Sequence, residues 1–437
     1  MIRHSFQKKN IFIRLPFSAD FLTLAMAFAD KGARGFGYGD RETGGLVLAI
    51  EELFSFYERE STKGSTVEIE MEDQGYRLVL SLFFCLADPD MRAFNLTWNV
   101  NHDSQESLEM LGPMIAARTL SSLRLEFGAD EKVILRLTRN REYSMAERVA
   151  LPPSGNTSTL RLLNPSRDDL YHFASMAATY GSPFLPPFLA RPEMAADMLE
   201  SGHLNALLVA GDDWIMGGVL WKPLTDSCLE LYGPYLFIDN PDDEAMTLLM
   251  DEAVKCISRS WFKGLVRRQG ALAGHERFFD FLGEIQLSGK NDVNATYYYR
   301  QLKEESSGVV YCTGNLAIFL DEQYRRLCLP RQIRTASNLR LRNASVLAVE
   351  LENARSLAVM RPLCAGKDLD TNIRAHLDLL HGQGIENFIV ELDTGRSEDV
   401  AFADALEKNS FLPRLLIPDA GLGDLVIYDH CKLNAQS

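Results

Sequence analysis

One stretch decides the fold of the N-terminal part of this chain: Gly45-Leu46-Val47-Leu48-Ala49-Ile50-Glu51-Glu52-Leu53-Phe54-Ser55-Phe56-Tyr57-Glu58-Arg59. Its apolar residues recur three and four positions apart, at Leu46, Ala49, Ile50, Leu53, Phe54 and Tyr57. This spacing places them on one face of an amphipathic helix, with the glutamates on its flanks and opposite side. We therefore predict a helix whose apolar face packs on a sheet.

The segments on either side of this helix supply that sheet. They are expected to be a strand (11–15), a helix (18–29), a glycine-rich helix stop (32–39), a hairpin (66–83) and a last strand (132–138). This order predicts an α/β sandwich in residues 1–144. Residues 145–159 contain Pro152, Pro153, Ser154 and Gly155 and are expected to be a linker.

A second domain is expected in residues 160–305. Its first half contains a strand from Leu160 (160–164), a helix (168–180), a proline-rich segment (181–192) and a three-stranded meander (205–237). Its second half contains a helix (242–261), a strand (264–268), a helix (276–283) and a strand (296–302). An antiparallel meander followed by a helix and another strand predicts a mixed sheet.

The last 132 residues, 306–437, repeat part of this order. They are expected to contain a hairpin (345–362), a helix (368–382), a strand (386–392), a second helix (397–410) and two further strands (411–418 and 424–428). In this repeat, residues 410–413 stand where residues 282–284 stand in the second domain. The fold class is therefore predicted as α/β (α+β), a sandwich followed by two mixed-sheet lobes of which the second is partial.

Composition limits the possible partners. The net charge is −15, from 45 basic and 60 acidic residues, which argues against nucleic acid because phosphate binding needs clustered Lys and Arg. No apolar run reaches the length of a membrane span, and no signal peptide is recognised. Seven cysteines without paired spacing indicate reduced thiols, so a cytoplasmic location is expected. The eight histidines are scattered, and no metal site is predicted.

The run "LAIEELFSFYER" resembles the first motif helix of the anti-sigma-factor serine kinases, in the histidine-kinase-like ATPase superfamily. The resemblance implies that Glu52 is the base that activates a seryl hydroxyl. Phe56 stands where the family has the asparagine that holds magnesium, and a phenyl ring offers no oxygen ligand. The other interpretation of Glu51 and Glu52 is a solvated helix flank.

Two later segments match further motifs of that family. The resemblance implies that Asp88 or Asp90, ahead of Phe94, accepts the adenine amino group, and that Gly112 opens a phosphate-binding helix. The alternative is that residues 88–94 form a capped loop and that Gly112 only precedes a helix start at Pro113.

The meander, helix and strand of the second domain look like the acyl-CoA-binding core of the GNAT family of N-acetyltransferases, and Phe278, Phe281 and Leu282-Gly283 echo its helix end. The resemblance implies that an acyl-CoA loop lies ahead of the second domain's long helix, at Phe237, Ile238, Asn240 and Asp242. This loop contains no glycine and is followed by further carboxylates, which would repel a pyrophosphate.

Besides a binding loop for the acyl-CoA, acyl transfer needs a general base and a general acid. Glu230 with Tyr297, Tyr298 or Tyr299 could supply them, or the tyrosines could be packing residues. The cofactors that the two resemblances allow are ATP with magnesium and an acyl-CoA.

The expected function is that of a bacterial regulatory protein with a degenerate ATP-binding domain and GNAT-like lobes, which acts through protein or small-ligand binding. A partner of the anti-sigma antagonist kind is implied by resemblance only. The alternatives are an active N-acyltransferase that uses acetyl-CoA or another acyl-CoA, and an ATP-dependent serine kinase of such an antagonist.

Overall fold

A computed structural model describes most of the chain. The described residues are 9–98, 111–128, 131–152, 160–211, 214–237, 243–270, 276–288, 293–304, 307–337, 339 and 341–431. The chain divides into two compact units: Met1–Glu142, Arg340–Val349 and Pro362–Leu379 form the first, and Tyr143–Leu339, Glu350–Arg361 and Leu380–Ser437 form the second. This grouping differs from the three expected domains, because the last part of the chain contributes to both units.

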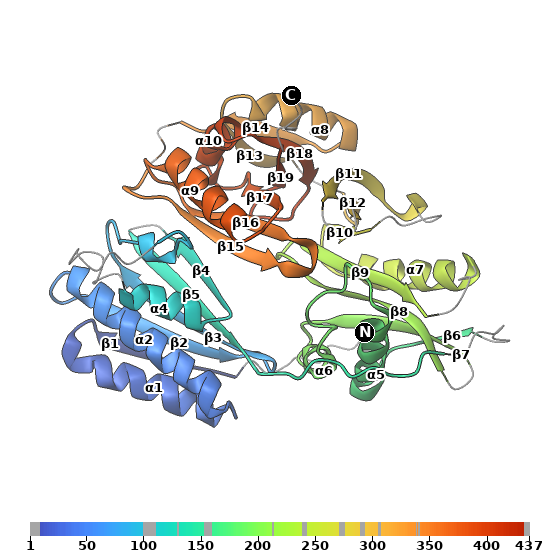
Figure 1. Cartoon of the computed structure of the whole chain (residues 1–437), viewed down its shortest axis with the longest axis horizontal. Coiled ribbons are helices and arrows are strands. Elements are labelled where there is room, and N and C mark those ends of the chain that lie inside the picture. Colours follow the sequence, from blue (N-terminus) through green and yellow to red (C-terminus); the bar gives the residue numbers. More distant parts are fainter. Residues whose placement is uncertain are drawn as a thin grey trace. The chain divides into compact units, whose positions relative to one another are not determined.

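The first unit contains a five-stranded antiparallel sheet in the order β1-β2-β3-β5-β4. Its strands are β1 (Lys9–Pro16), β2 (Thr66–Asp73), β3 (Arg77–Cys85), β4 (Ser122–Phe127) and β5 (Lys132–Asn140). Helices α1 (Leu22–Gly35), α2 (Asp40–Glu60) and α4 (Leu111–Thr119) cover one face of this sheet (Figure 1). Short 3-10 turns precede α1 at Ala19–Phe21 (η1) and α4 at Arg92–Phe94 (η2).

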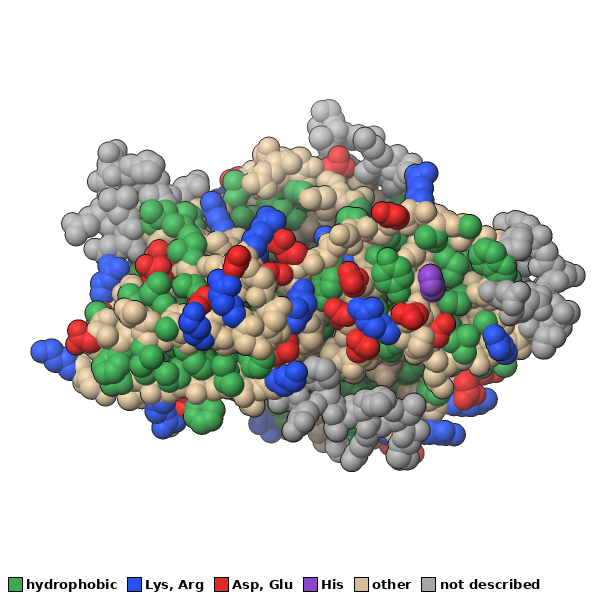
Figure 2. Space-filling model, turned by 90° about the horizontal axis from the view of Figure 1, so that it is seen from below, with side chains coloured by type: hydrophobic (Ala, Val, Ile, Leu, Met, Phe, Trp, Pro, Cys, Tyr) green, Lys and Arg blue, Asp and Glu red, His purple; other side chains and the backbone are tan. Residues whose placement is uncertain are grey.

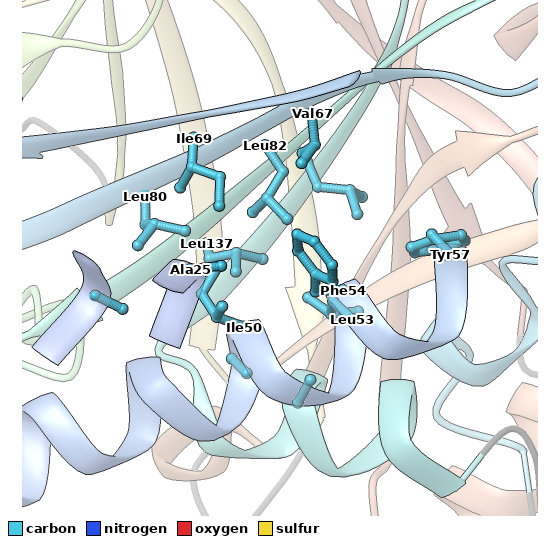
Figure 3. Packing of buried hydrophobic residues seen from close by; sticks show 14 of the residues in the cluster. Ala25, Ile50, Leu53, Phe54, Tyr57, Val67, Ile69, Leu80, Leu82 and Leu137 are labelled. Atoms are coloured by element: carbon cyan, nitrogen blue, oxygen red, sulfur yellow. The ribbon is translucent and has the colours of Figure 1, made fainter. Parts of the chain in front are cut away.

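Helix α2 packs on the sheet as its spacing predicts. The six apolar residues singled out in the sequence are all 0% exposed. Figure 3 shows Ile50, Leu53 and Phe54 pointing from α2 toward side chains of the strands, including Ile69 and Leu82. Each such side chain contributes about 1.5–3 kcal/mol when it is fully buried.

Helix α1 ends within the predicted glycine-rich stretch, residues 32–39. It continues through Gly32 to Gly35. A Cβ on Gly32 would lie 2.8 Å from Ile11 Cδ1 and 2.9 Å from Met71 Sδ, so this glycine allows α1 to approach the strands closely. The helix end predicted within residues 32–39 is confirmed, at Gly35. Strand β4 was not predicted at all.

Residues from the C-terminal part complete the first unit. The buried side chain of Asn95 donates to the Ser345 carbonyl at 2.8 Å and accepts from the Leu347 amide at 3.0 Å. The Asn372 side chain also donates to the Ser345 carbonyl, at 2.9 Å. Val346, between these residues, is fully buried in the core of this unit. The first unit is therefore built from segments more than 200 residues apart in sequence.

The second unit contains a seven-stranded sheet in the order β11-β12-β10-β9-β8-β7-β6. Its strands are β6 (Leu160–Leu163), β7 (Asn205–Gly211), β8 (Trp214–Pro223), β9 (Cys228–Leu236), β10 (Gly264–Gln269), β11 (Asp280–Leu287) and β12 (Val293–Gln301). Its helices are α5 (Arg167–Tyr180), α6 (Pro192–Glu200) and α7 (Asp243–Ser258). Only β9 and β10 pair in parallel among these described strands.

One predicted helix in this unit is a strand. Residues 276–283 form a short 3-10 turn, Glu276–Phe278 (η3), and the beginning of β11. In β11, Ile285 and Leu287 are buried while Glu284 and Gln286 are exposed, which is the alternation of a strand with one buried face. The prediction rested on the resemblance of Phe278, Phe281 and Leu282-Gly283 to the helix end of the GNAT family.

A second mixed sheet has the order β15-β16-β17-β19-β18. Its elements are β15 (Val346–Glu352), η4 (Asn353–Arg355), β16 (Leu357–Cys364), α9 (Leu369–Gly382), β17 (Asn387–Asp393), η5 (Asp399–Ala401), α10 (Phe402–Lys408), β18 (Phe411–Ile417) and β19 (Leu425–His430). The predicted mixed α/β class is thereby confirmed. The helix predicted over residues 397–410 is a 3-10 turn followed by a shorter α-helix.

This second sheet repeats the order of β8 to β12. Strand β16 pairs in parallel with β17, as β9 does with β10, and the partner strands that follow are antiparallel in both cases. Arg268 pairs with Tyr297 and Glu391 pairs with Ile427, so Arg268 and Glu391 are equivalent positions. Each repeat also has a bulge before the next equivalent residue, which is Gly283 in one and Leu415 in the other. The sequence alignment of this region was therefore displaced by three to four residues, because it placed Gly283 opposite residue 411 or 412 rather than Leu415.

The two repeats pack through equivalent strands in the second unit. Residues of β11 and β12 share a core with residues of β18 and β19, and a Cβ on Gly283 would lie 3.4 Å from the Cβ of its equivalent, Leu415. Contact between equivalent positions is the property of an isologous, two-fold interface. We therefore describe residues 214–301 and 346–430 as the first and second repeat.

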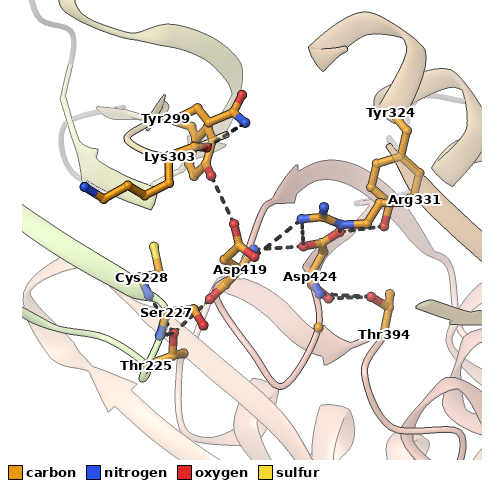
Figure 4. A network of polar contacts seen from close by, with 12 residues as sticks. Thr225, Ser227, Cys228, Tyr299, Lys303, Tyr324, Arg331, Thr394, Asp419 and Asp424 are labelled. Atoms are coloured by element: carbon orange, nitrogen blue, oxygen red, sulfur yellow. Dashed lines mark hydrogen bonds and ion pairs between the residues drawn. The ribbon is translucent and has the colours of Figure 1, made fainter. Parts of the chain in front are cut away.

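A parallel strand pair that was not predicted completes this unit. It consists of β13 (Gly308–Cys312), α8 (Leu316–Leu327) and β14 (Arg331–Thr335). Arg331 donates from Nε to Asp424 at 2.8 Å and contacts Asp419 at 3.4 Å (Figure 4). Tyr324 donates to Asp424 at 2.9 Å. These charges are almost fully buried, and the pairing fixes β14 to the turn before β19.

Candidate functional site

The structure brings two of the predicted site residues of the first unit together. Glu52 lies on α2 and Gly112 near the start of α4, and a Cβ on Gly112 would overlap a carboxylate oxygen of Glu52. The absence of a side chain at Gly112 therefore leaves room for Glu52. Phe56, one turn after Glu52, is 7% exposed and its ring lies edge-on to that of Tyr57 at 4.9 Å. It is a core residue in the position where a magnesium ligand was sought.

Both predicted adenine-binding carboxylates are engaged within the first unit. Asp88 accepts from Arg342 at 3.2 Å and from the Asn343 side chain at 3.1 Å. Asp90 accepts three hydrogen bonds from the Arg92 guanidinium: Nε donates to Oδ1 at 3.1 Å and to Oδ2 at 3.0 Å, and Nη2 donates to Oδ2 at 2.6 Å. These contacts favour the alternative in which residues 88–94 form a capped loop.

In the second unit the parallel strands β9 and β10 separate. They pair only from Cys228 with Gly264 to Leu231 with Arg267. Strand β9 then continues to Leu236 along β8, with a register shift. Where two parallel strands diverge, backbone N–H and C=O groups lose their ladder partners and must bond elsewhere. The backbone groups beyond this pairing are therefore the groups whose partners decide whether a ligand can enter between the strands.

Side chains of β10 fill the divergence. Arg267 donates from Nε to the Gly233 carbonyl at 2.7 Å, and the Gln269 side-chain oxygen accepts from the Gly233 amide at 2.9 Å. Gln269 also donates to the Tyr235 hydroxyl at 2.9 Å. Arg267 and Gln269 are each 6% exposed. Both backbone groups of Gly233 are therefore occupied by the protein itself.

Glu230, the predicted base, is held in a buried ion-pair chain. Its carboxylate accepts from Arg268 Nε at 2.8 Å and from the Tyr232 hydroxyl at 2.5 Å. Arg268 also donates to Glu391 at 2.9 Å, and Arg361 donates to Glu391 at 2.5 Å. These charges connect the two repeats and satisfy one another.

The environment of Glu230 decides what it can do chemically. Burial alone would raise its pKa, but the charge and hydrogen bond of Arg268, with Lys222 and Tyr232, lower the pKa to about 2. A carboxylate with this pKa is a weak base at neutral pH. Glu230 is therefore suited to form ion pairs with cationic groups rather than to accept a proton.

The tyrosines predicted as acids have other surroundings. Tyr299 donates to Asp419 at 3.2 Å, and Tyr298 packs edge-on against Phe281 with ring centroids 5.9 Å apart. Tyr297 is buried, and burial raises its pKa to about 12. The tyrosine that contacts Glu230 is Tyr232, two residues along the same strand, which the sequence analysis did not consider.

One residue of the predicted acyl-CoA loop lies within the described residues. Phe237 is 5% exposed, and its ring packs against Phe173 and Tyr180 of α5 with centroids 5.4 and 6.0 Å apart. It is a packing residue. Ile238, Asn240 and Asp242 lie outside the described residues, and their assignment stays a prediction.

The described residues contain no convergent set of three His, Cys, Asp or Glu side chains that could hold a metal. On the face drawn in Figure 2, the coloured basic and acidic side chains are interspersed with one another and with hydrophobic ones. No described helix has the length and apolarity needed to cross a bilayer.

The residues that fill the divergence were missed in the sequence. Arg267, Arg268 and Gln269 follow one another in and directly after the strand predicted over residues 264–268, and the sequence analysis assigned no role to them. The available signal was the position of this run in the strand after the long helix, which a parallel sheet places at its centre.

No protein-family model and no curated protein sequence matches the chain. Among solved structures, it is similar to an N-acetyltransferase from Staphylococcus aureus Mu50, with 14% identity and a TM-score of 0.28 over 33% of this chain and 100% of that one. It is similar to an acetyltransferase of the GNAT family from Streptococcus pneumoniae, with 11% identity and a TM-score of 0.27 over 33% and 99%.

A third similar structure is an aminoglycoside 6'-N-acetyltransferase complexed with coenzyme A, with 9% identity and a TM-score of 0.27 over 33% of this chain and 99% of that one. TM-scores of this size do not by themselves establish a fold or an activity. The function is therefore inferred from the strand order and the site residues.

Proposed function

We propose that this chain is a regulatory binding protein whose GNAT-like lobe does not transfer acyl groups. The lobe keeps the order of meander, helix and parallel strand that the resemblance implies. The residues of the divergence between β9 and β10 serve the protein's own structure. The protein acts mainly through the binding of another protein or of a small ligand.

One observation carries this proposal: the side chains of Arg267 and Gln269 occupy both backbone groups of Gly233. A ligand that entered between the strands would have to displace two buried, hydrogen-bonded side chains. Each buried donor or acceptor left without a partner costs about 1–3 kcal/mol. The two hydrogen-bonded side chains therefore oppose acyl-CoA binding, because contacts with the ligand must first offset the free energy of the lost hydrogen bonds.

The state of Glu230 supports the same function. A base for acyl transfer has to accept a proton from an amine near neutral pH. The pKa of Glu230 is held at about 2 by its buried pairing with Arg268, and both carboxylate oxygens have donors. The strands thus lack both an open backbone and a free base at this point.

In the first unit, Asp88 and Asp90 are engaged by Arg342 and Arg92, and Phe56 has no oxygen to offer magnesium. We propose that this unit is a degenerate ATP-binding domain that contributes protein contacts. A small antagonist-like protein domain is the partner that the resemblance implies.

The test is calorimetric titration of the full-length protein with acetyl-CoA and CoA, together with thiol release from acetyl-CoA in the presence of primary amines. The proposal predicts dissociation constants weaker than about 1 mM and no release above the uncatalysed rate. Micromolar binding with amine-dependent release would overturn it.

The second candidate is an active N-acyltransferase. The observation in its favour is the separation of β9 and β10, since a sheet without a ligand gains nothing from it. In that case Arg267 and Gln269 would swing out when acyl-CoA binds, and the titration above would show tight binding to the wild-type protein.

A further inference from the structure

Lys222 lies in an unusual setting near the end of β8. Its ammonium stands over two aromatic rings, with Nζ 5.4 Å from the ring centroid of Phe188 and 5.4 Å from that of Tyr232. Both distances are within the range in which the negative face of a ring attracts a cation. The side chain of Lys222 itself is half-buried.

The two rings form a fixed corner. Phe188 and Tyr232 meet edge to face, with centroids 5.1 Å apart and planes at 90°. Phe188 is 5% exposed and Tyr232 is 8% exposed, so both are held by packing. Tyr232 comes from β9, while Phe188 comes from the segment between α5 and α6. A corner assembled from separate segments is preorganised, because neither ring has to move when a cation enters.

A carboxylate completes the corner. Lys222 lies opposite Glu230 in the pairing of β8 with β9, and Tyr232 donates its hydroxyl to Glu230 at 2.5 Å. Glu230 is ionised at neutral pH, since its pKa is about 2. Two ring faces beside a buried carboxylate supply the attraction that an ammonium group needs when it leaves water.

We propose that the corner of Phe188, Tyr232 and Glu230 is a binding site for a primary alkylammonium group, which Lys222 occupies in cis. The ligand class is a primary alkylammonium, the group that ends a lysine side chain or an aliphatic amine. A primary ammonium fits because its three N–H donors can face the rings and the carboxylate while its alkyl stem leaves along the path of Lys222.

This inference goes beyond the proposed function and does not depend on it. The site requires neither acyl-CoA nor turnover, and it lies on the strands β8 and β9 rather than in the filled divergence. Failure of the test below would leave the calorimetric result with acetyl-CoA unaffected, and the reverse also holds.

The experiment is chemical rescue of the full-length Lys222→Ala protein. This substitution removes three methylene groups and the ammonium, which n-propylammonium replaces atom for atom. Thermal unfolding is measured with n-propylammonium chloride and, as controls, with equal concentrations of sodium chloride and n-propanol. We expect the melting temperature of Lys222→Ala to rise by about 2 °C or more with n-propylammonium only.

Two further variants separate recognition from nonspecific stabilisation. Lys222→Met fills the stem without a charge, and the wild-type corner is already occupied, so neither should respond beyond the sodium chloride control. Adding Phe188→Leu to Lys222→Ala removes one ring and should weaken n-propylammonium binding by about 2- to 30-fold. If Lys222→Ala does not fold, Lys222→Ser opens the same space and takes its place.

The outcomes are distinct. A response of the opened corner that is lost with Phe188→Leu supports the site. No response of either opened variant, or an equal response of the wild-type protein or of the variant that lacks the ring, overturns it.

Discussion

The two repeats share strand order, register and a bulge, but the chemistry of their side chains differs at three successive positions in β10 and β17. In the first repeat, β10 has Arg267, Arg268 and Gln269, and in the second repeat the equivalent residues of β17 are Val390, Glu391 and Leu392. Val390 and Leu392 are fully buried apolar residues. The second repeat thus has an ordinary core where the first has polar side chains.

This difference indicates where ligand chemistry belongs. The middle positions, Arg268 and Glu391, carry opposite charges and pair with each other at 2.9 Å, so they join the repeats. The outer positions of the first repeat instead bind the backbone of Gly233. At the outer positions the second repeat has buried apolar side chains, whereas the first has hydrogen-bonding groups that a ligand could use if they moved.

The pair that joins the repeats gives the largest expected effect. Arg268→Ala leaves Glu230 and Glu391 buried without their shared partner, and we expect a loss of about 3–5 kcal/mol in the free energy of unfolding. Urea denaturation measures it. As a control, Arg268→Met combined with Glu230→Gln and Glu391→Gln removes the uncompensated charge and should restore most of the stability. A loss below about 1 kcal/mol for Arg268→Ala would show that the pair does not hold the repeats together.

The pairing of Glu230 also predicts a pH dependence. Its folded-state pKa of about 2 lies below the reference value of 4.5, so its contribution is fully present above pH 4.5 and is lost as the pH falls toward 2. We expect Glu230→Gln to reduce the loss of stability between pH 5 and pH 3 by on the order of 2 kcal/mol relative to wild type. Parallel stability curves for the two proteins would contradict the assignment.

Exchanging one outer position tests the comparison directly. Gln269→Leu gives the first repeat the residue that the second has at position 392. It leaves the Gly233 amide and the Tyr235 hydroxyl without their partner, at an expected cost of about 1–3 kcal/mol. The matched control is Leu392→Met, a volume-conserving change with an expected cost below about 1.5 kcal/mol. Equal stability of Gln269→Leu and wild type would mean that water replaces the Gln269 amide freely.

The smallest expected effect is at the contact between equivalent residues. Gly283 has φ +153°, a conformation that L-residues rarely adopt, so Gly283→Ala adds backbone strain, while its new Cβ would make an ordinary contact with the Leu415 Cβ at 3.4 Å. We expect a cost of about 1 kcal/mol, measured by thermal unfolding. Gly382→Ala is the control, because a Cβ there meets no atom within 4 Å. A cost above that of Gln269→Leu would place the weak point of the repeats at this contact.

Much of the fold follows from patterns in the sequence. The apolar face of α2 and the meander β7 to β9 were predicted closely, because periodicity over many residues indicates which face is buried. Strands β13 and β14 and helix α8 were missed. They are short, and Arg331 in β14 is buried only because Asp424 lies opposite it, nearly a hundred residues later. No local pattern reveals such a partner.

The candidate site was less predictable for the same reason. Glu230 was identified, but its pKa is set by Arg268, and its tyrosine contact is Tyr232. Asp88 was identified, but it is engaged by Arg342, 254 residues away in sequence. Residue types suggested the chemistry, whereas the partners that decide whether a group is free depend on the tertiary fold.

The central claim is that the protein's own side chains close the divergence of β9 and β10. Its most direct test is hydrogen–deuterium exchange at the Gly233 amide, in wild type and in Gln269→Ala, with and without acetyl-CoA. The account predicts strong protection in wild type that acetyl-CoA does not change, and rapid exchange in Gln269→Ala. Rapid exchange in wild type that slows only when acetyl-CoA is added would show an open crevice that binds the cofactor, and it would contradict the account.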